Sequence, residues 1–285
     1  MSDYAKDVLV TTQWVEDHLD DDSIRIVEVD ENAALYSESH IPGAIGFDWQ
    51  ADLQDATRRD FLSPEDFGKL LGNAGISNDH TVVLYGDRNN WFAAYTYWYL
   101  KYYGHDKVKL INGPRELWIE EGRATTTDVP SYEATTFTAK QGDGSIRAYR
   151  DDVHAALRSE TKLVDVRSPQ EYSGEILSAP GYEHEAASVG GHIPGAASIP
   201  WATAVNENGT FKSRDELKEI YGGKGVFNEN GGETIAYCRI GERSAHTWFV
   251  LHELLGQDNV RNYDGSWTEW GNLINVPIEK GAPAA

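Results

Sequence analysis

The chain contains a single cysteine, Cys238, among 285 residues. One cysteine excludes an internal disulfide and any metal site built from clustered cysteines, and we expect neither a metal nor a cofactor. No apolar run approaches the roughly 20 residues that a membrane helix needs. The first residues, Met1 to Trp14, lack the basic and apolar regions of a secretory signal. The sequence therefore predicts a cytoplasmic protein that makes no membrane contact.

Basic residues are also scarce. The chain has 25 lysines and arginines against 46 acidic residues, a formal charge of −21. Such a charge repels polyanions, so we expect no nucleic-acid partner. An acidic excess of this size is typical of proteins from salt-loving organisms, and the alternative is an ordinary acidic soluble protein. Equal stability in low and in molar salt would contradict the first interpretation.

The sequence repeats itself. The pentapeptide His-Ile-Pro-Gly-Ala occurs at residues 40–44 and again at residues 192–196, 152 positions later. Five further landmarks keep the same offset, and they are the pairs Tyr85 and Tyr237, Gly104 and Gly256, Val108 and Val260, Gly113 and Gly265, and Trp118 and Trp270. A repeat of this length indicates a duplicated domain. The second copy carries an insertion, roughly residues 174–190, that the first copy lacks.

The pattern of each half predicts alternating strands and helices. We expect strands over residues 163–166, 234–237 and 260–263 and a helix over residues 244–255, with helices also starting at Ser63 and Ser213. This order predicts an α/β fold with two similar domains, each a mostly parallel sheet with helices on both faces. We place an inactive domain at 1–123, a polar linker at 124–146 and a catalytic domain at 147–285.

The two halves differ where function is expected. The first half reads Tyr85-Gly86, whereas the second reads Tyr237-Cys238 and continues Arg-Ile-Gly-Glu-Arg-Ser to residue 244. The only cysteine thus follows a buried strand and precedes a helix, at the sheet edge where open α/β sheets bind ligands. Gly86 cannot carry thiol chemistry.

A tight loop between a strand and a helix can turn its backbone amides inward and form an anion-binding nest. Arg239 and Arg243 add positive charge, and Gly241 allows the backbone geometry that the loop needs. These features predict a lowered pKa for Cys238, with mostly thiolate near neutral pH. The alternative for a lone cysteine is a small buried hydrophobe.

The motifs described so far, with Asp-Val-Arg at residues 165–167 and Asp-Gly-Ser-Trp at residues 264–267, closely resemble those of the rhodanese family, specifically tandem-domain thiosulfate sulfurtransferases. The resemblance covers nearly the whole chain. It implies that Cys238 is catalytic, taking the outer sulfur of thiosulfate as a persulfide, releasing sulfite, and passing the sulfur to cyanide or a thiol. It also implies substrate-binding roles for Arg167, Arg239, Ile240, Gly241, Glu242, Arg243 and Ser244. Some family members have lysine at the position of Ile240, so Arg243 is expected to supply that charge here.

Three alternatives remain open. Mercaptopyruvate sulfurtransferases have a less charged loop at this position, whereas the basic loop of this chain favours thiosulfate as the donor. Related phosphatases have arginine six positions after the cysteine, whereas Arg243 follows Cys238 by five. The third alternative is a persulfide carrier, which hands sulfur to a thiol or a protein partner. Such a carrier would use Cys238, as would an enzyme that acts on small-molecule donors and acceptors.

Other residues are expected to be structural or peripheral. His40 and His192 occur in both halves, including the one without cysteine, which favours a structural turn role. For His246 we expect a surface or packing role. By resemblance, the site lies in a cleft between the domains, to which Asp48 and Trp49 could contribute.

Overall fold

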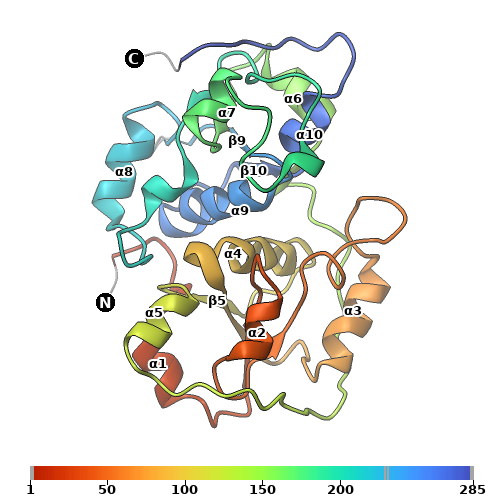
Figure 1. Cartoon of the computed structure of the whole chain (residues 1–285), viewed down its shortest axis with the longest axis vertical. Coiled ribbons are helices and arrows are strands. Elements are labelled where there is room, and N and C mark those ends of the chain that lie inside the picture. Colours follow the sequence, from red (N-terminus) through yellow and green to blue (C-terminus); the bar gives the residue numbers. More distant parts are fainter. Residues whose placement is uncertain (1–2, 228, 230, 283–285) are drawn as a thin grey trace. The chain divides into compact units, whose positions relative to one another are not determined.

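A computed structural model describes residues 3–227, 229 and 231–282. The chain divides into two compact units, coloured along the sequence in Figure 1. The first-half unit comprises residues 8–143 and 205–211, and the second-half unit comprises residues 144–204 and the described residues of 212–282, together with the segment that ends at Asp7. Most of the expected linker therefore groups with the first-half unit. There Thr126 N donates to His40 O over 2.9 Å, and Thr135 N donates to Gly72 O over 2.8 Å.

The first-half unit is built on a five-stranded sheet in which every described strand pair is parallel, in the order β1-β5-β4-β2-β3. Its elements are β1 Leu9–Val10, α1 Thr12–Asp17, β2 Ile24–Glu28, α2 Ala34–Glu38, β3 Ile45–Gly46, α3 Pro64–Asn73, β4 Thr81–Tyr85, α4 Asp87–Tyr102, β5 Val108–Ile111 and α5 Arg115–Glu120.

The second-half unit has the same sheet, in the equivalent order β6-β10-β9-β7-β8. Its elements are β6 Arg147–Ala148, α6 Arg150–Ala156, β7 Lys162–Asp165, α7 Pro169–Ser173, η1 Glu183–Glu185, β8 Ala197–Ser198, η2 Trp201–Ala204, α8 Arg214–Gly222, β9 Thr234–Tyr237, α9 Glu242–Trp248, the π-helical η3 Phe249–Leu254, β10 Val260–Tyr263 and α10 Ser266–Trp270. The matching orders confirm the predicted α/β fold and the duplication.

Short sequence signals explain where several helices begin. Ser63 caps α3 by accepting a hydrogen bond from Asp66 N, with Pro64 at the first helical position. Ser213 and Glu216 form a reciprocal capping box at the start of α8. These caps satisfy amide groups that the first helical turn leaves without partners, so both predicted starts are confirmed.

The core of the second-half unit lies around β9 and the helix that follows it. Every residue of β9 is buried, and so is every residue of α9. In Figure 1 the blue α9 runs beside β10, and Trp248 Nε1 donates to Val260 O over 2.9 Å. The helix begins at Glu242 instead of the expected residue 244, continues into η3, and is followed by Gly256 in the left-handed conformation (φ 80°). A helix buried all round gives its first turn a dry environment.

The order β10-β9-β7 brings three loops to one sheet edge. Arg167 follows β7, Cys238 follows β9 and Asp264 follows β10. Carboxyl ends of parallel strands meet at the same edge, so these segments form the rim that positions the cysteine. No helix among the described residues is both long and apolar enough to cross a membrane.

The repeated histidines hold equivalent turns. His40 stacks on Tyr36 with ring centroids 4.0 Å apart, and His192 stacks on Tyr172 at 3.6 Å. Each histidine Nδ1 also lies within hydrogen-bond distance of that tyrosine's carbonyl oxygen. The same arrangement in both units agrees with the structural role expected for the two histidines.

Candidate active site

Cys238 occupies the first position after the central strand β9 and is fully buried. Its backbone is fixed by hydrogen bonds with residues at and just after the end of the neighbouring strand β10. Cys238 N donates to Ser266 Oγ over 3.0 Å, Ser266 Oγ donates to Tyr263 O over 2.6 Å, and Trp267 N donates to Cys238 O over 3.0 Å. The cysteine backbone is therefore fixed before any ligand arrives.

The loop turns amides toward the sulfur, as predicted. Gly241 N donates to Cys238 Sγ over 3.1 Å, and Ser244 also hydrogen-bonds Cys238. Gly241 adopts φ 97°, and a Cβ built on it would lie 2.5 Å from Asp264 Cα. Both the left-handed conformation and the close approach require glycine at this position. Ser244 Oγ in turn donates to Asn262 Oδ1 over 2.6 Å, which ties the start of α9 to β10.

The loop also contains a carboxylate next to the sulfur. The basic nest predicted from the sequence did not include this negative charge. Cys238 Sγ donates to Glu242 Oε2 over 3.3 Å, and Ile240 N donates to the same oxygen over 3.2 Å. Glu242 Oε1 accepts from Arg239 Nη2 over 2.9 Å and lies 3.9 Å from Arg243 Nε. Glu242 is only 1% exposed, so this charge acts on the sulfur through a dry medium.

The prediction of a lowered thiol pKa is wrong for this structure. Burial raises the pKa of Cys238 above its ordinary value, and the negative charge of Glu242 raises it further. Arg243 and the hydrogen bonds from Ser244 act in the opposite direction without overcoming these two causes. This direction favours the thiol form of the resting cysteine near neutral pH, because burial and the neighbouring carboxylate both disfavour the thiolate.

Arg243 is held by α7. Its Nη1 donates to Glu171 Oε2 over 2.9 Å and its Nη2 donates to Glu171 Oε1 over 3.0 Å, in a buried two-pronged pair. Burial acts to raise the pKa of Glu171, but the charge and hydrogen bonds of Arg243 lower it to about 2. Sequence reasoning missed Glu171. Its one sequence signal is the capping box with Ser168, which predicts a helix start and not an arginine contact.

Arg239 is held by the insertion of the second half. Its Nε lies 2.6 Å from Glu185 Oε2, and its guanidinium stacks on the ring of Tyr182, 3.7 Å from the ring centre. Among the described residues, Nη1 of this buried arginine makes no hydrogen bond. The insertion thus supplies two side chains to the residue next to Cys238, a role that its composition alone did not indicate.

Arg167 lies at the same sheet edge but binds elsewhere. It donates to Asp165 through Nε and Nη2, over 3.0 and 2.6 Å, and to Gly191 O over 2.7 Å. Its guanidinium lies over the ring of Trp267, 4.6 Å from the ring centre. None of these contacts reaches the Cys238 loop, so a substrate-binding role for Arg167 stays a prediction.

The contacts also correct the prediction that the loop around Cys238 is basic. Arg239 and Arg243 are matched by three carboxylates, Glu242, Glu171 and Glu185. His246 follows on α9, fully buried with its ring against Trp201, and burial lowers its pKa to about 3. It is therefore neutral near pH 7, and of the surface and packing roles that we considered for it, its burial agrees with packing.

The first-half unit has no equivalent chemistry. Gly86 N donates to Asn90 Oδ1 over 2.9 Å, and Asn90 Nδ2 donates to Ile111 O and Gly113 O over 2.8 and 3.0 Å. The loop is thus closed by its own side chain. A Cβ added at Gly86 would collide with Val29 O, so this backbone cannot accommodate a cysteine.

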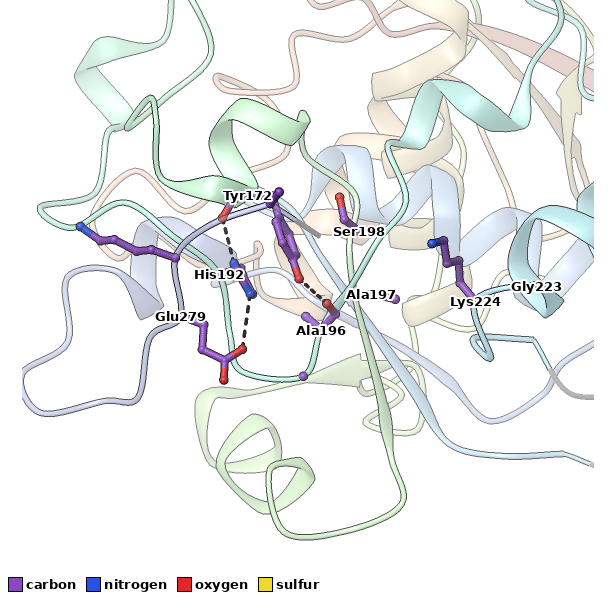
Figure 2. Close-up of a pocket in the computed structure, with 11 residues that line it drawn as sticks. Tyr172, His192, Ala196, Ala197, Ser198, Gly223, Lys224 and Glu279 are labelled. Carbon is purple, nitrogen blue, oxygen red and sulfur yellow. Dashed lines mark hydrogen bonds and ion pairs between the residues drawn. The ribbon is translucent and has the colours of Figure 1, made fainter. Parts of the chain in front are cut away.

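A pocket of about 590 Å³ lies elsewhere in the second-half unit (Figure 2). Figure 2 shows Tyr172 and His192 in its wall with Glu279, and no residue of the Cys238 loop lines it. The first-half unit has a smaller pocket of about 250 Å³ in the equivalent place, lined by Tyr36, Ile45 and Gly46, the counterparts of Tyr172, Ala197 and Ser198. Since the feature recurs in the half without cysteine, it belongs to the architecture.

Residues 11–121 and 150–273 each match the family model of the rhodanese-like domain. The chain therefore belongs to the rhodanese family, with two such domains.

Relatives carry names from sulfur chemistry. A Haloferax volcanii protein, provisionally named thiosulfate sulfurtransferase, is 59% identical over 98% of this chain and 99% of its own length. The sulfur carrier protein TtuD of Thermus thermophilus is 56% identical over 96% of this chain and 97% of its own length. A solved structure of EanB, with ergothioneine linked to a persulfide cysteine, is 28% identical with a TM-score of 0.85, covering 97% of this chain and 70% of that chain.

Proposed function

We propose that this protein transfers the outer sulfur of thiosulfate to an acceptor through a persulfide on Cys238. The observation that carries the proposal is the loop itself, in which Gly241 N donates to Sγ over 3.1 Å, and Arg239 and Arg243 both contact Glu242, the carboxylate that accepts from Sγ. An inward amide is suited to a sulfur atom that gains negative charge during the reaction. Sulfite leaves in the first step, and cyanide or a thiol removes the sulfur in the second.

Thiosulfate is the donor that we favour over mercaptopyruvate. A sulfonate oxygen accepts hydrogen bonds from a guanidinium, and the buried Nη1 of Arg239 has no hydrogen bond within the described part of the chain. The names of the Haloferax and Mycobacterium leprae relatives support the same donor. Because three carboxylates balance the two arginines, this preference rests on an available guanidinium donor and not on net positive charge.

A second candidate function is that of a sulfur carrier, which the name of the Thermus relative favours. The same persulfide would form on Cys238, and the sulfur would then pass to a protein. Turnover with cyanide or small thiols separates the two: a carrier forms the persulfide but turns over slowly without its partner. A single free cysteine that must stay reduced supports action in the cytoplasm.

The testing experiment compares two donors at equal enzyme concentration. Sulfite release from thiosulfate and pyruvate release from mercaptopyruvate are measured with cyanide as acceptor, and Cys238→Ser serves as the control. We expect faster sulfite release, lost in the serine variant. Faster pyruvate release would assign the enzyme to mercaptopyruvate, and sulfite release that survives in Cys238→Ser would overturn the proposal.

A further inference from the structure

The thiol of Cys238 must lose a proton before its sulfur can attack a donor, and the structure surrounds it with protein instead of water. Cys238 is fully buried and Glu242 is 1% exposed. The S–H group donates to Glu242 Oε2 over 3.3 Å. A proton leaving Sγ therefore has a carboxylate oxygen at hydrogen-bond distance, within the same loop.

Other charged and titratable groups lie on the elements around this loop, and most have fixed partners of their own. They are Arg239 in the loop, Arg243 and His246 on α9, Glu171 on α7, Asp165 and Arg167 at the end of β7, Tyr182 and Glu185 in the insertion, and Asp264 after β10 with its partner Arg147. Glu171, with a pKa of about 2, stays ionised against Arg243, and His246, with a pKa of about 3, stays neutral. The carboxylate hydrogen-bonded to Sγ is Glu242.

We propose that Glu242 is a catalytic residue that shares one proton with Cys238, accepting it when the sulfur becomes a nucleophile and holding it while the persulfide exists. The proposal rests on the sulfur transfer proposed above. Two negative charges side by side in this dry loop would repel each other strongly, whereas one shared proton leaves the pair with a single negative charge. Arg239 Nη2, 2.9 Å from Glu242 Oε1, stays in place in both states.

The steps balance as follows. Cys238 S–H gives its proton to the Glu242 carboxylate. The resulting thiolate forms a bond to the outer sulfur of thiosulfate, the S–S bond of thiosulfate breaks, and its electron pair leaves with sulfite. The outer sulfur then carries the negative charge of the persulfide, with Glu242 protonated. When cyanide takes that sulfur and leaves as thiocyanate, Cys238 Sγ keeps the electron pair and recovers the proton from Glu242.

The first test uses the pH dependence of Cys238 alkylation by iodoacetamide in the full chain. Glu242→Gln keeps the shape of the protonated carboxyl and removes its charge. We expect its alkylation midpoint to fall by at least about one pH unit, so that it reacts roughly tenfold faster than the wild type near pH 7. Glu185→Gln is the matched control, because it also removes a carboxylate paired with Arg239, whereas the hydrogen bond from Sγ goes to Glu242. An equal shift in both variants, or none in Glu242→Gln, overturns the proposal.

The second test follows the proton directly. The infrared difference spectrum between persulfide and resting enzyme should gain the carbonyl band of a protonated carboxyl in the wild type, and this band should be missing in Glu242→Gln. A persulfide spectrum without the band in the wild type overturns the proposal. Mass spectrometry of the same thiosulfate-treated sample separates the two levels: a wild-type chain that gains no sulfur refutes the proposed function, whereas the alkylation test still decides the role of Glu242.

Discussion

Replacement of Glu171 by glutamine should weaken the second-half unit because it leaves the buried Arg243 without its counter-charge. The pKa of Glu171 falls from an ordinary 4.5 to about 2. Since one pKa unit corresponds to about 1.4 kcal/mol, the ionised carboxylate stabilises the fold by about 3 kcal/mol. Breaking a buried ion pair by removing one partner costs about 3–5 kcal/mol, which agrees.

Urea unfolding of the full chain at pH 7 measures this loss, with the exposed Glu175→Gln as a control that should change the free energy of unfolding by less than about 0.5 kcal/mol. The folded-state pKa of Glu171 is lowered, so its contribution is complete above about pH 4.5 and disappears as the pH falls toward 2. The difference between wild type and Glu171→Gln should therefore narrow below pH 4.5. A loss under about 1 kcal/mol at pH 7, or a difference that widens in acid, would refute the reasoning.

Three further predictions concern stability and the loop. Burial and the neighbouring Glu28 raise the pKa of Asp30 to about 9, so its contribution to wild-type stability should fall as the pH rises from about 4 to 9. In urea unfolding at pH 8, Asp30→Asn should therefore be more stable than wild type by more than about 1 kcal/mol. A less stable variant contradicts this prediction. Gly241→Ala should reduce sulfite release at least tenfold, because Gly241 has a φ of 97° and an added Cβ would collide with Asp264. Gly144→Ala is the control and should keep the wild-type rate, because a Cβ there has no neighbour within 4 Å. Equal activities of the two variants would argue against the loop geometry. With a net charge of −21, the free energy of unfolding should rise from low to molar potassium chloride, since 1 M salt screens charges beyond about 3 Å, and unchanged stability would reject salt adaptation.

The fold could be predicted from the sequence because the duplication constrains it twice. The 152-residue offset aligns β4 with β9 and β5 with β10, so each half supports the assignment of the other. Strand Thr234–Tyr237 was predicted with its observed bounds, since a short buried run between turn residues leaves little choice. The position of Cys238 after the central strand follows from the same alignment.

The electrostatics of the site could not be predicted in the same way. Sequence shows that Glu242 lies four residues after Cys238, but only the left-handed Gly241 folds the loop so that the carboxylate reaches the sulfur. Residues distant in sequence decide the rest: Glu171 takes up Arg243, and Glu185 takes up Arg239. Local spacing gave the arginines near the cysteine and carried no information on which carboxylates would balance them.

The central claim, that Cys238 carries sulfur, is tested most directly by mass spectrometry of the intact chain after thiosulfate treatment and removal of excess reagent. The account predicts a gain of one sulfur, about 32 Da, mapped to the peptide that contains Cys238, reversed by cyanide and absent in Cys238→Ser. An unchanged wild-type mass would contradict it, whether or not the sample releases sulfite.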